Sequence, residues 1–420
     1  MYKSTKNILK SATINASIGV RQGAPSSCLL FVIYIDHMVR MIKRAVGDDG
    51  FLGMLHVLLL MDDAVIVATS REMCLKKMEI VNEFCRESGM KINETKTKFF
   101  VINGDERDKQ CLTSGGVSVS YTGQYLYLGA WFTESATMDS VMALHQTASE
   151  AIMNKFSIFC ASNTTMPFMY KRVVFDAAVT SALLYGAESW FTGKMKVIEK
   201  QYSKLVKCLL GVRKNTSFNL CMIEAGILPV QDISEKRKWK FIKSQREPVD
   251  IEKPFQFVYN MCRDANTPGY RCLERSGLPS DDTNGLQKIV NYVREKATGA
   301  TKLTTYIADM NPNMTVHPVY RTRSFVPDYK RQAFTRLRLM SHNLRVEVGR
   351  WNRTPREQRV CQCDGVQVQT ESHVLIECPL SARCRDTYNM LTFTDIRELL
   401  QENNHVHELC GYINDVLNNY

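Results

Sequence analysis

The chain has 420 residues, 45% of them hydrophobic, which is enough for roughly two or three buried cores and argues against a disordered protein. Its 54 Lys and Arg exceed its 43 Asp and Glu, which mildly favours a polyanionic partner. Fourteen cysteines without a signal peptide indicate reduced thiols in an intracellular protein. No apolar run reaches the length of a membrane span, because Asp62 and Asp63 interrupt the longest, so no membrane partner is expected.

The first elements are a basic, polar stretch, a loop and a helix. The first acidic residue of the chain is Asp36. Gly19–Ser27 holds two glycines and a proline, which predicts a loop whose backbone lets a ligand approach closely. Ser26 or Ser27 can cap a following helix, whose apolar stripe would be Leu29, Leu30, Ile33, His37, Met41 and Ile42.

The stretch Met54–Thr69 predicts a β-hairpin with two carboxylates at its tip. Two apolar runs without alternation flank the acids, which favours strands buried on both faces. Asp62-Asp63 would be the two-residue turn, yet it lacks the usual glycine and sets like charges side by side. A bound Mg²⁺ would relieve this repulsion. The alternative is an acidic surface turn, as expected for Asp48-Asp49-Gly50.

Helical and strand patterns alternate from Ser70 to Gly211. Ser70 can cap a helix that ends at Gly89, with an apolar stripe of Cys74, Met78, Val81, Phe84 and Cys85. Phe99–Ile102 and Tyr125–Phe132 read as short strands, and Gly129 marks a place where another group approaches. Most of Asp139–Gly211 has the spacing of amphipathic helices.

Basic residues gather later in the chain. Lys236–Lys240 interleaves cations with Trp239 and could follow a phosphate backbone or be a solvated helix face. Between 247 and 318 the pattern is weak, and polar clusters at Pro279–Gly285 and Asn311–Pro318 read as loops or linkers. Tyr320–Val360 then holds eleven Lys and Arg against three acids. A helix over Tyr329–Val348 predicts a basic side for nucleic acid, made of Lys330, Arg331, Arg338 and Arg345.

Three cysteines and a histidine follow at compact spacing: Cys361, Cys363, His373 and Cys378. Three thiolates and an imidazole are a structural Zn²⁺ set with no open position for catalysis. The Cys-x-Cys start is tighter than usual, and Cys384 is an alternative ligand.

Four of these segments, in this order, resemble the palm of non-LTR (LINE-type) retrotransposon reverse transcriptases. Gly19–Phe31 is similar to their Gly-x-x-Gln-Gly-x-x-x-Ser-Pro-Leu-Leu-Phe segment, with Cys28 in place of the proline. Leu60-Met61-Asp62-Asp63 lies where they carry an aromatic-Ala-Asp-Asp tetrad. Lys91–Lys98 is similar to their lysine-bearing segment, and Leu126–Gly129 to the primer-grip hairpin.

The resemblance continues beyond the palm. Leu183–Trp190 is similar to the Leu-Leu-Tyr-Gly-x-Glu-x-Trp signature of the thumb, although Tyr185 and Trp190 read more readily as core residues than as base-stacking platforms. The expected fold is α+β, a partial palm with an antiparallel sheet followed by helices. The expected domains are palm 1–135, helical thumb 136–246, linker 247–318, basic helical region 319–360, CCHC zinc knuckle 361–384 and helical tail 385–420.

This resemblance implies an RNA-directed DNA polymerase in the nucleus or cytoplasm of a eukaryote, acting on an RNA template, a DNA primer or target, and deoxynucleoside triphosphates. Asp62 and Asp63 would be catalytic ligands of two Mg²⁺, Gln22 and Gly23 would border the template and nucleotide, and Lys96 or Lys98 would neutralise triphosphate charge.

The family's other metal-binding aspartate precedes the Gln-Gly loop, whereas Met1–Ile35 contains no Asp or Glu. We therefore expect an N-terminally truncated element that is inactive alone, unless a second chain supplies the missing palm and fingers. The alternatives are a non-catalytic RNA- or DNA-binding remnant that uses the basic region and zinc knuckle, and a product without function.

Overall fold

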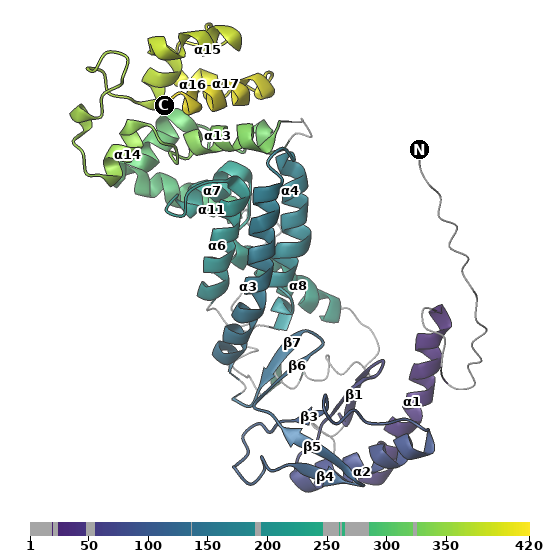
Figure 1. The fold of residues 1–420 in the computed structure, drawn as a ribbon. Helices are drawn as coiled ribbons and strands as arrows, with labels where there is room; N and C mark the ends of the chain where they lie inside the picture. The colour runs from purple at the N-terminus through teal and green to yellow at the C-terminus, as the bar shows by residue number, and fades with distance from the viewer. Residues whose placement is uncertain are drawn as a thin grey trace, which may run out of the picture. The chain divides into compact units, whose positions relative to one another are not determined.

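The computed structural model describes residues 19, 24–47, 55–135, 137–189, 195–246, 260, 263–264, 285–321 and 326–420 (Figure 1). The chain divides into two compact units. Unit 1 comprises 1–125 and 132–135, and unit 2 comprises 126–131 and 136–420. Residues 126–131, which were expected in the palm, belong to unit 2, and the expected domain boundaries stay predictions. Unit 2 is not subdivided further at the boundaries expected at 246, 318, 360 and 384.

Unit 1 combines two helices with short strands, and the α+β class expected from the sequence is confirmed. Its strands form a two-stranded antiparallel hairpin, β1-β2, and a three-stranded sheet of order β3-β5-β4, in which β3 pairs parallel to β5. A second hairpin, β6-β7, joins this unit to the next. The elements are α1 Pro25–Val46, β1 Val57–Leu60, β2 Asp63–Ile66, α2 Arg71–Glu87, β3 Lys98–Phe99, β4 Leu112–Ser114, β5 Val117–Tyr121, β6 Gln124–Tyr127 and β7 Ala130–Thr133.

The β1-β2 hairpin is supported by the two helices of unit 1. Alternate residues of β1, Val57 and Leu59, pack into a cluster with Phe84 of α2 and the buried face of α1. The other face of β1 is open, with Leu58 40% and Leu60 51% exposed. The expectation of strands buried on both faces is therefore wrong, because only one face of the hairpin is covered.

Helix α2 forms as expected, whereas α1 turns a different side inward. Ser70 caps α2 by accepting a hydrogen bond from Met73 N at 3.2 Å, and Gly89 follows its end at a φ of +66°. In α1 the buried residues are Ser27, Ile35, Met38 and Ile42. The expected stripe is wrong at Leu29, Leu30 and Ile33, which are all more than half exposed.

Helix α1 also corrects the expectation that no segment could span a membrane. Among the described residues it is the one helix that is long and apolar enough, by length and composition alone. Core helices of globular proteins and signal sequences pass the same test. Its inner face already packs against Phe84.

Unit 2 is built from helices (Figure 1). Its α-helices are α3 Met138–Ser162, α4 Phe168–Val174, α5 Ser181–Leu183, α6 Lys196–Leu210, α7 Phe218–Ala225, α8 Val230–Arg246, α11 Gly285–Lys296, α12 Thr301–Thr305, α13 Asp328–Arg338, α14 Arg345–Trp351, α15 Ala382–Thr387, α16 Ile396–Leu400 and α17 Val406–Asn418. Shorter 3-10 or π turns connect them: η1 Phe175–Thr180, η2 Ala187–Ser189, η3 Ala297–Gly299, η4 Tyr306–Met310, η5 Pro318–Tyr320, η6 Arg356–Gln358, η7 His373–Glu377 and η8 Pro379–Ser381.

One apolar core runs through unit 2 from α3 to α17. From 285 onward, the expected linker contributes to this core through Val290, Val293 and Tyr306. Within the expected polar loop Asn311–Pro318, the Asn311 side chain is fully buried and donates to Thr315 O at 2.9 Å. The linker interpretation is wrong for this part, because its side chains are buried in the core of unit 2. A polar side chain such as that of Asn311 can lie in a core when its hydrogen bonds are satisfied.

Candidate metal centres and basic surface

The two carboxylates of the β1-β2 hairpin lie at its loop end and are exposed. Leu60 pairs with Asp63, so the two-residue loop is Met61-Asp62 and Asp63 begins β2. The expected turn, Asp62-Asp63, is therefore wrong by one residue. The register still sets the two carboxylates on consecutive residues, one in the loop and one on the strand.

The hairpin loop carries backbone strain at Met61. Its φ is +55°, in the left-handed region that favours glycine, at the first central position of the loop. Such a conformation costs a non-glycine residue about 1–2 kcal/mol. The strained residue directly precedes the two acids, so the loop conformation sets the direction of their side chains. Backbone strain of this kind is common at functional sites.

The donor set fits a divalent cation. No Lys, Arg or His among the described residues forms an ion pair with Asp62 or Asp63, so no cation of this part of the chain compensates their charges. Adjacent carboxylates are hard oxygen ligands that suit Mg²⁺, which keeps several waters and is completed by substrate phosphates. An exposed pair on a short hairpin leaves room for those further ligands.

The other residues expected at this site are placed less closely. Gln22 and Gly23 lie outside the described residues. Lys98 Nζ donates to Ser120 Oγ at 2.6 Å on the neighbouring strand β5, and Lys96 lies in an exposed turn closed by Asn93. Neither lysine forms an ion pair with the hairpin acids, so their expected contact with a triphosphate stays a prediction.

In unit 2, Cys361, Cys363, His373 and Cys378 come together as a possible metal-binding group. Their ligand atoms all lie within 4.8 Å of one another. Cys361 Sγ is 3.7 Å from Cys378 Sγ, and Cys363 Sγ is 3.3 Å from His373 Nε2. A tetrahedral Zn²⁺ with Zn–S near 2.3 Å and Zn–N near 2.0 Å would separate two sulfurs by about 3.8 Å and a sulfur from a nitrogen by about 3.5 Å. The four residues therefore match the size of a zinc site.

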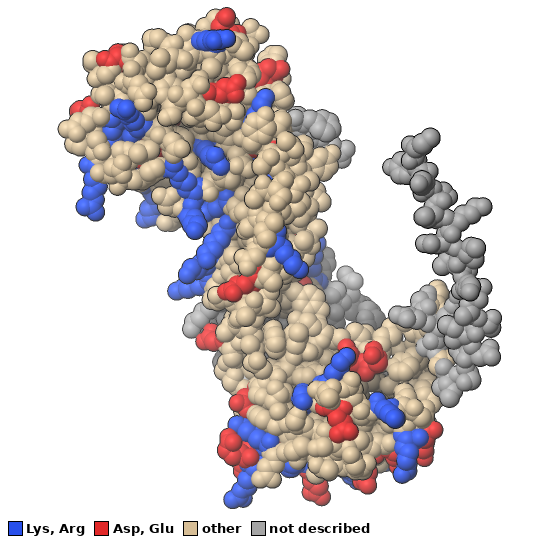
Figure 2. Space-filling model, viewed as in Figure 1, with Lys and Arg blue, Asp and Glu red and all other residues tan. Residues whose placement is uncertain are grey.

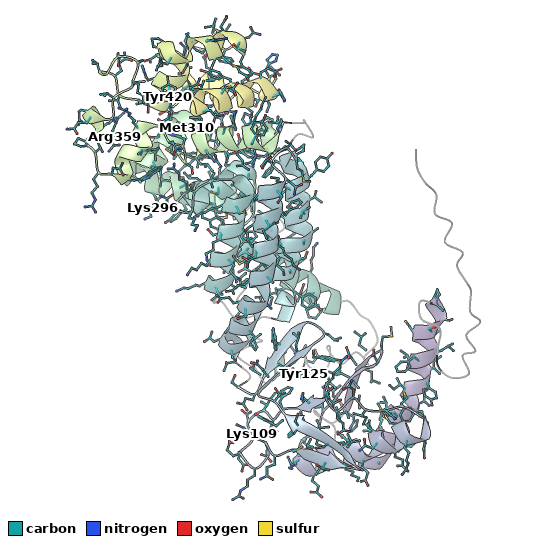
Figure 3. The ribbon with its side chains drawn as sticks, viewed as in Figure 1. Lys109, Tyr125, Lys296, Met310, Arg359 and Tyr420 are labelled. Carbon is teal, nitrogen blue, oxygen red and sulfur yellow. The ribbon has the colours of Figure 1, made fainter. Side chains whose placement is uncertain are left out.

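Nearby side chains orient these ligands. His373 Nδ1 faces Glu377 Oε2 at 3.5 Å, which leaves Nε2 turned toward the cysteines. Tyr420, labelled in Figure 3, donates its hydroxyl to Cys378 Sγ at 2.9 Å. The alternative ligand, Cys384, lies outside the group and accepts from Asn419 Nδ2 instead. Sequence spacing gave no signal for Tyr420. The contact of Glu377 with His373 could have been predicted, because the two residues are four positions apart.

Two of the four cations expected to contact nucleic acid are buried. Arg331 is fully buried and donates to Asp328 Oδ1 at 2.5 Å and to Leu210 O at 2.9 Å. Lys171 Nζ reaches the other oxygen of Asp328 at 2.6 Å, with both side chains fully buried. This charge network joins α4 and α6 to α13.

Arg338 belongs to a second buried network. Its Nε donates to Glu224 Oε1 at 2.5 Å, and Tyr306 donates to Glu224 Oε2 at 2.8 Å. The expected nucleic-acid contact is therefore wrong for Arg331 and Arg338, because both guanidinium groups lie in the core beside carboxylates. Arg345 stays exposed and Lys330 half-exposed, so their expected contact remains a prediction.

Gly129 and Tyr185 meet within unit 2. Gly129 has a φ of +79°, and a Cβ there would lie 2.8 Å from Tyr185 Cε1. The Tyr185 hydroxyl donates to Leu128 O at 2.6 Å, while the side chain stays 55% exposed. Tyr185 is thus the group that approaches Gly129 closely, as expected. The prediction that Tyr185 is a core residue is wrong, because its side chain is exposed. Trp190 lies outside the described residues.

Comparison with known families places the hairpin in a recognised domain. Residues 2–132 match the family model of reverse transcriptase (RNA-dependent DNA polymerase). No curated protein sequence matches the chain. The matched region contains Asp62, Asp63 and both lysines, and it ends in β7. It supports a reverse-transcriptase-like polymerase, a family that uses divalent metal, a nucleic-acid template and nucleotide substrates.

Proposed function

We propose that the chain is part of a non-LTR retrotransposon reverse transcriptase, an RNA-directed DNA polymerase, and that Asp62 and Asp63 bind its catalytic Mg²⁺. The observation that carries the proposal is the position of the two carboxylates, exposed and without a cationic partner among the described residues, on a hairpin inside the matched region 2–132. The order of the sequence motifs supports the non-LTR type.

The residues of this chain act by position and charge. Asp62, in the loop, is the principal metal ligand, and Asp63, at the start of β2, supports it. When bound, the metal supplies Lewis-acid activation of the primer 3′-hydroxyl and charge stabilisation of the leaving pyrophosphate. Gln22 and Gly23 border the new base pair, and Lys96 or Lys98 neutralises triphosphate charge.

Primer extension on an RNA template with Mg²⁺ tests this proposal. Met1–Ile35 has no carboxylate to serve as the second metal-binding residue, so the chain is assayed both alone and with an added palm fragment. This fragment comes from a reverse transcriptase. It carries the upstream aspartate but lacks its own hairpin acids. We expect extension that Asp62→Asn lowers by at least about 10²-fold. Glu79→Gln, an exposed carboxylate of α2, is the matched control and should not change the rate. Extension that is equal in wild type and Asp62→Asn would refute the proposal.

The Cys-Cys-His-Cys group favours a second candidate function, a non-catalytic RNA- or DNA-binding protein. Zn²⁺ at Cys361, Cys363, His373 and Cys378 would hold a zinc knuckle in unit 2. This function predicts RNA binding that survives Asp62→Asn and falls on Cys378→Ser. RNA binding that is unaffected by Cys378→Ser would exclude it.

A further inference from the structure

A cavity of about 620 Å³ opens on unit 2 between α12, α14 and η6. Four cationic side chains line it: Lys302, Arg350, Arg356 and Arg359. Figure 2 shows Lys and Arg gathered on this flank of the unit, around α14 and α11 in Figure 1. The volume lies in the range of pockets that hold a nucleotide-sized ligand.

The positive charge of the cavity is only partly compensated. Glu347, fully buried, forms ion pairs with Lys302 and Arg350. Arg356 is exposed and forms no ion pair or side-chain hydrogen bond with any residue that the structure describes. Several cations facing a single carboxylate leave a site that attracts an anion.

Arg359 is held in place by backbone carbonyls, so its charge is fixed but not neutralised. Its Nε and Nη2 donate to Thr354 O at 2.9 and 2.6 Å, and Nη1 donates to Val346 O at 2.9 Å. The stem of Arg359, labelled in Figure 3, lies along α14 at Gly349, where a Cβ would be 2.5 Å from Arg359 Cδ. A glycine at this position is what lets the arginine lie against the helix.

An aromatic ring lies on the same helix as Arg350. Trp351 is 39% exposed, and the Arg213 guanidinium lies over its ring at 3.8 Å from the centroid. Trp351 follows Arg350 directly in α14 and is not itself part of the cavity lining. Surfaces for single-stranded nucleic acid combine cations that meet phosphates with aromatic rings on which bases stack.

We propose that this cavity binds the phosphodiester backbone of single-stranded nucleic acid, with Arg356 and Arg359 at a phosphate and Trp351 beside a base. The proposal rests on the proposed function only for the choice of a nucleic-acid ligand. It moves the nucleic-acid contact of the basic region from the buried Arg331 and Arg338 to residues that the sequence pattern did not single out.

Fluorescence anisotropy with a labelled 20-nucleotide single-stranded RNA tests the site. Arg356→Glu should weaken binding at least tenfold near 0.1 M salt and should lower the slope of log K against log salt by about 0.7 for each phosphate that the protein no longer neutralises. Arg383→Glu, on the exposed side of α15 and outside the cavity, makes the same charge change and should have less than a third of that effect. Equal losses of affinity for the two variants, or no loss for Arg356→Glu, would overturn the proposal.

A second variant tests the fixed arginine. Gly349→Ala adds a single methyl group within a helix, and the clash should displace Arg359 and weaken RNA binding severalfold, with an unchanged circular dichroism spectrum. Unchanged RNA affinity for this variant would contradict the assigned role of Arg359.

Competition identifies the source of the phosphate. Unlabelled RNA should displace the probe at far lower concentration than a deoxynucleoside triphosphate or inorganic phosphate. Equal competition by the triphosphate would replace the proposal with a mononucleotide site, and displacement by an acidic peptide at the concentration of RNA would replace it with a protein-docking site. RNA binding by the wild-type chain that Arg356→Glu weakens, together with no primer extension by the wild-type chain even when the palm fragment is added, would refute the proposed polymerase function and leave this site standing.

Discussion

Replacing Asp328 by Asn should destabilise unit 2 strongly. The carboxylate bonds Lys171 Nζ at 2.6 Å and Arg331 Nη2 at 2.5 Å, and all three side chains are essentially inaccessible to solvent. Asn keeps the shape but leaves two cations buried without a counter-charge. Breaking a buried ion pair from one side costs about 3–5 kcal/mol. In a unit of this size, that corresponds to a fall in Tm of roughly 6–15 °C.

The measurement is urea and thermal unfolding at pH 7 for wild type, Asp328→Asn and a matched control. Asp176→Asn is the control, because its carboxylate pairs with Arg172 at 2.7 Å but is half exposed. Exposed pairs of this spacing contribute about 0.3–0.5 kcal/mol. A loss of stability in Asp328→Asn no larger than that in Asp176→Asn would refute the reasoning that buried charges hold α13 in place.

The pH dependence of this difference has a definite sign. Burial by itself would raise the pKa of Asp328, but Arg331 and Lys171 outweigh it and lower the pKa below its usual value. The stabilisation is therefore present above the unfolded pKa near 3.9 and is lost as pH falls through the lower folded value. The gap between wild type and Asp328→Asn should persist from pH 7 to about pH 4 and close only below it.

Three further predictions concern unit 2. Burial lowers the pKa of His317 to about 3, so between about pH 6.5 and 3 this side chain binds a proton in the unfolded state but not in the folded state. The free energy of unfolding should therefore fall as the pH is lowered over this window. His317→Asn should reduce this dependence on pH in unfolding titrations. Cys160 lies beside Cys208 and lowers its pKa below the usual value, so the rate of Cys208 alkylation should rise at a lower pH than for an ordinary thiol, and a midpoint near 8.5 would contradict this effect. Zinc should bind the purified chain in a 1:1 ratio by metal analysis, and Cys363→Ser should lower that ratio and the Tm together, whereas Cys384→Ser should change neither.

Local signals predicted local structure. The cap at Ser70, the end of α2 at Gly89 and the Cys-Cys-His-Cys group depend on residues close in sequence, and the structure shows each of them. The hairpin was also predicted, but its loop lies one residue earlier, since a pairing register is set by facing side chains rather than by composition.

Contacts distant in sequence could not be predicted in this way. Helical spacing placed Arg331 and Arg338 on a basic face. The carboxylate that binds Arg331, Asp328, is only three residues away, but the Leu209 carbonyl that also binds it is 122 residues away, and Glu224, which binds Arg338, is 114 residues away. The buried side of α1 could not be predicted for the same reason. It is the side that packs against Phe84 of α2, which is not the most apolar stripe of the helix. An Arg or Lys on a predicted helix therefore indicates an exposed face only when no carboxylate from another segment can pair with it.

The most direct test of the central claim is iron-dependent hydroxyl-radical cleavage of the chain, with Fe²⁺ in place of Mg²⁺ and with primer-template and deoxynucleoside triphosphate present. Backbone cuts should centre on Met61–Ala64, be suppressed by excess Mg²⁺, and be absent in Asp62→Asn but retained in Glu79→Gln. Cuts that are unchanged in Asp62→Asn, or wild-type cuts only at the cysteine-rich group, would contradict a metal-binding role for the hairpin carboxylates.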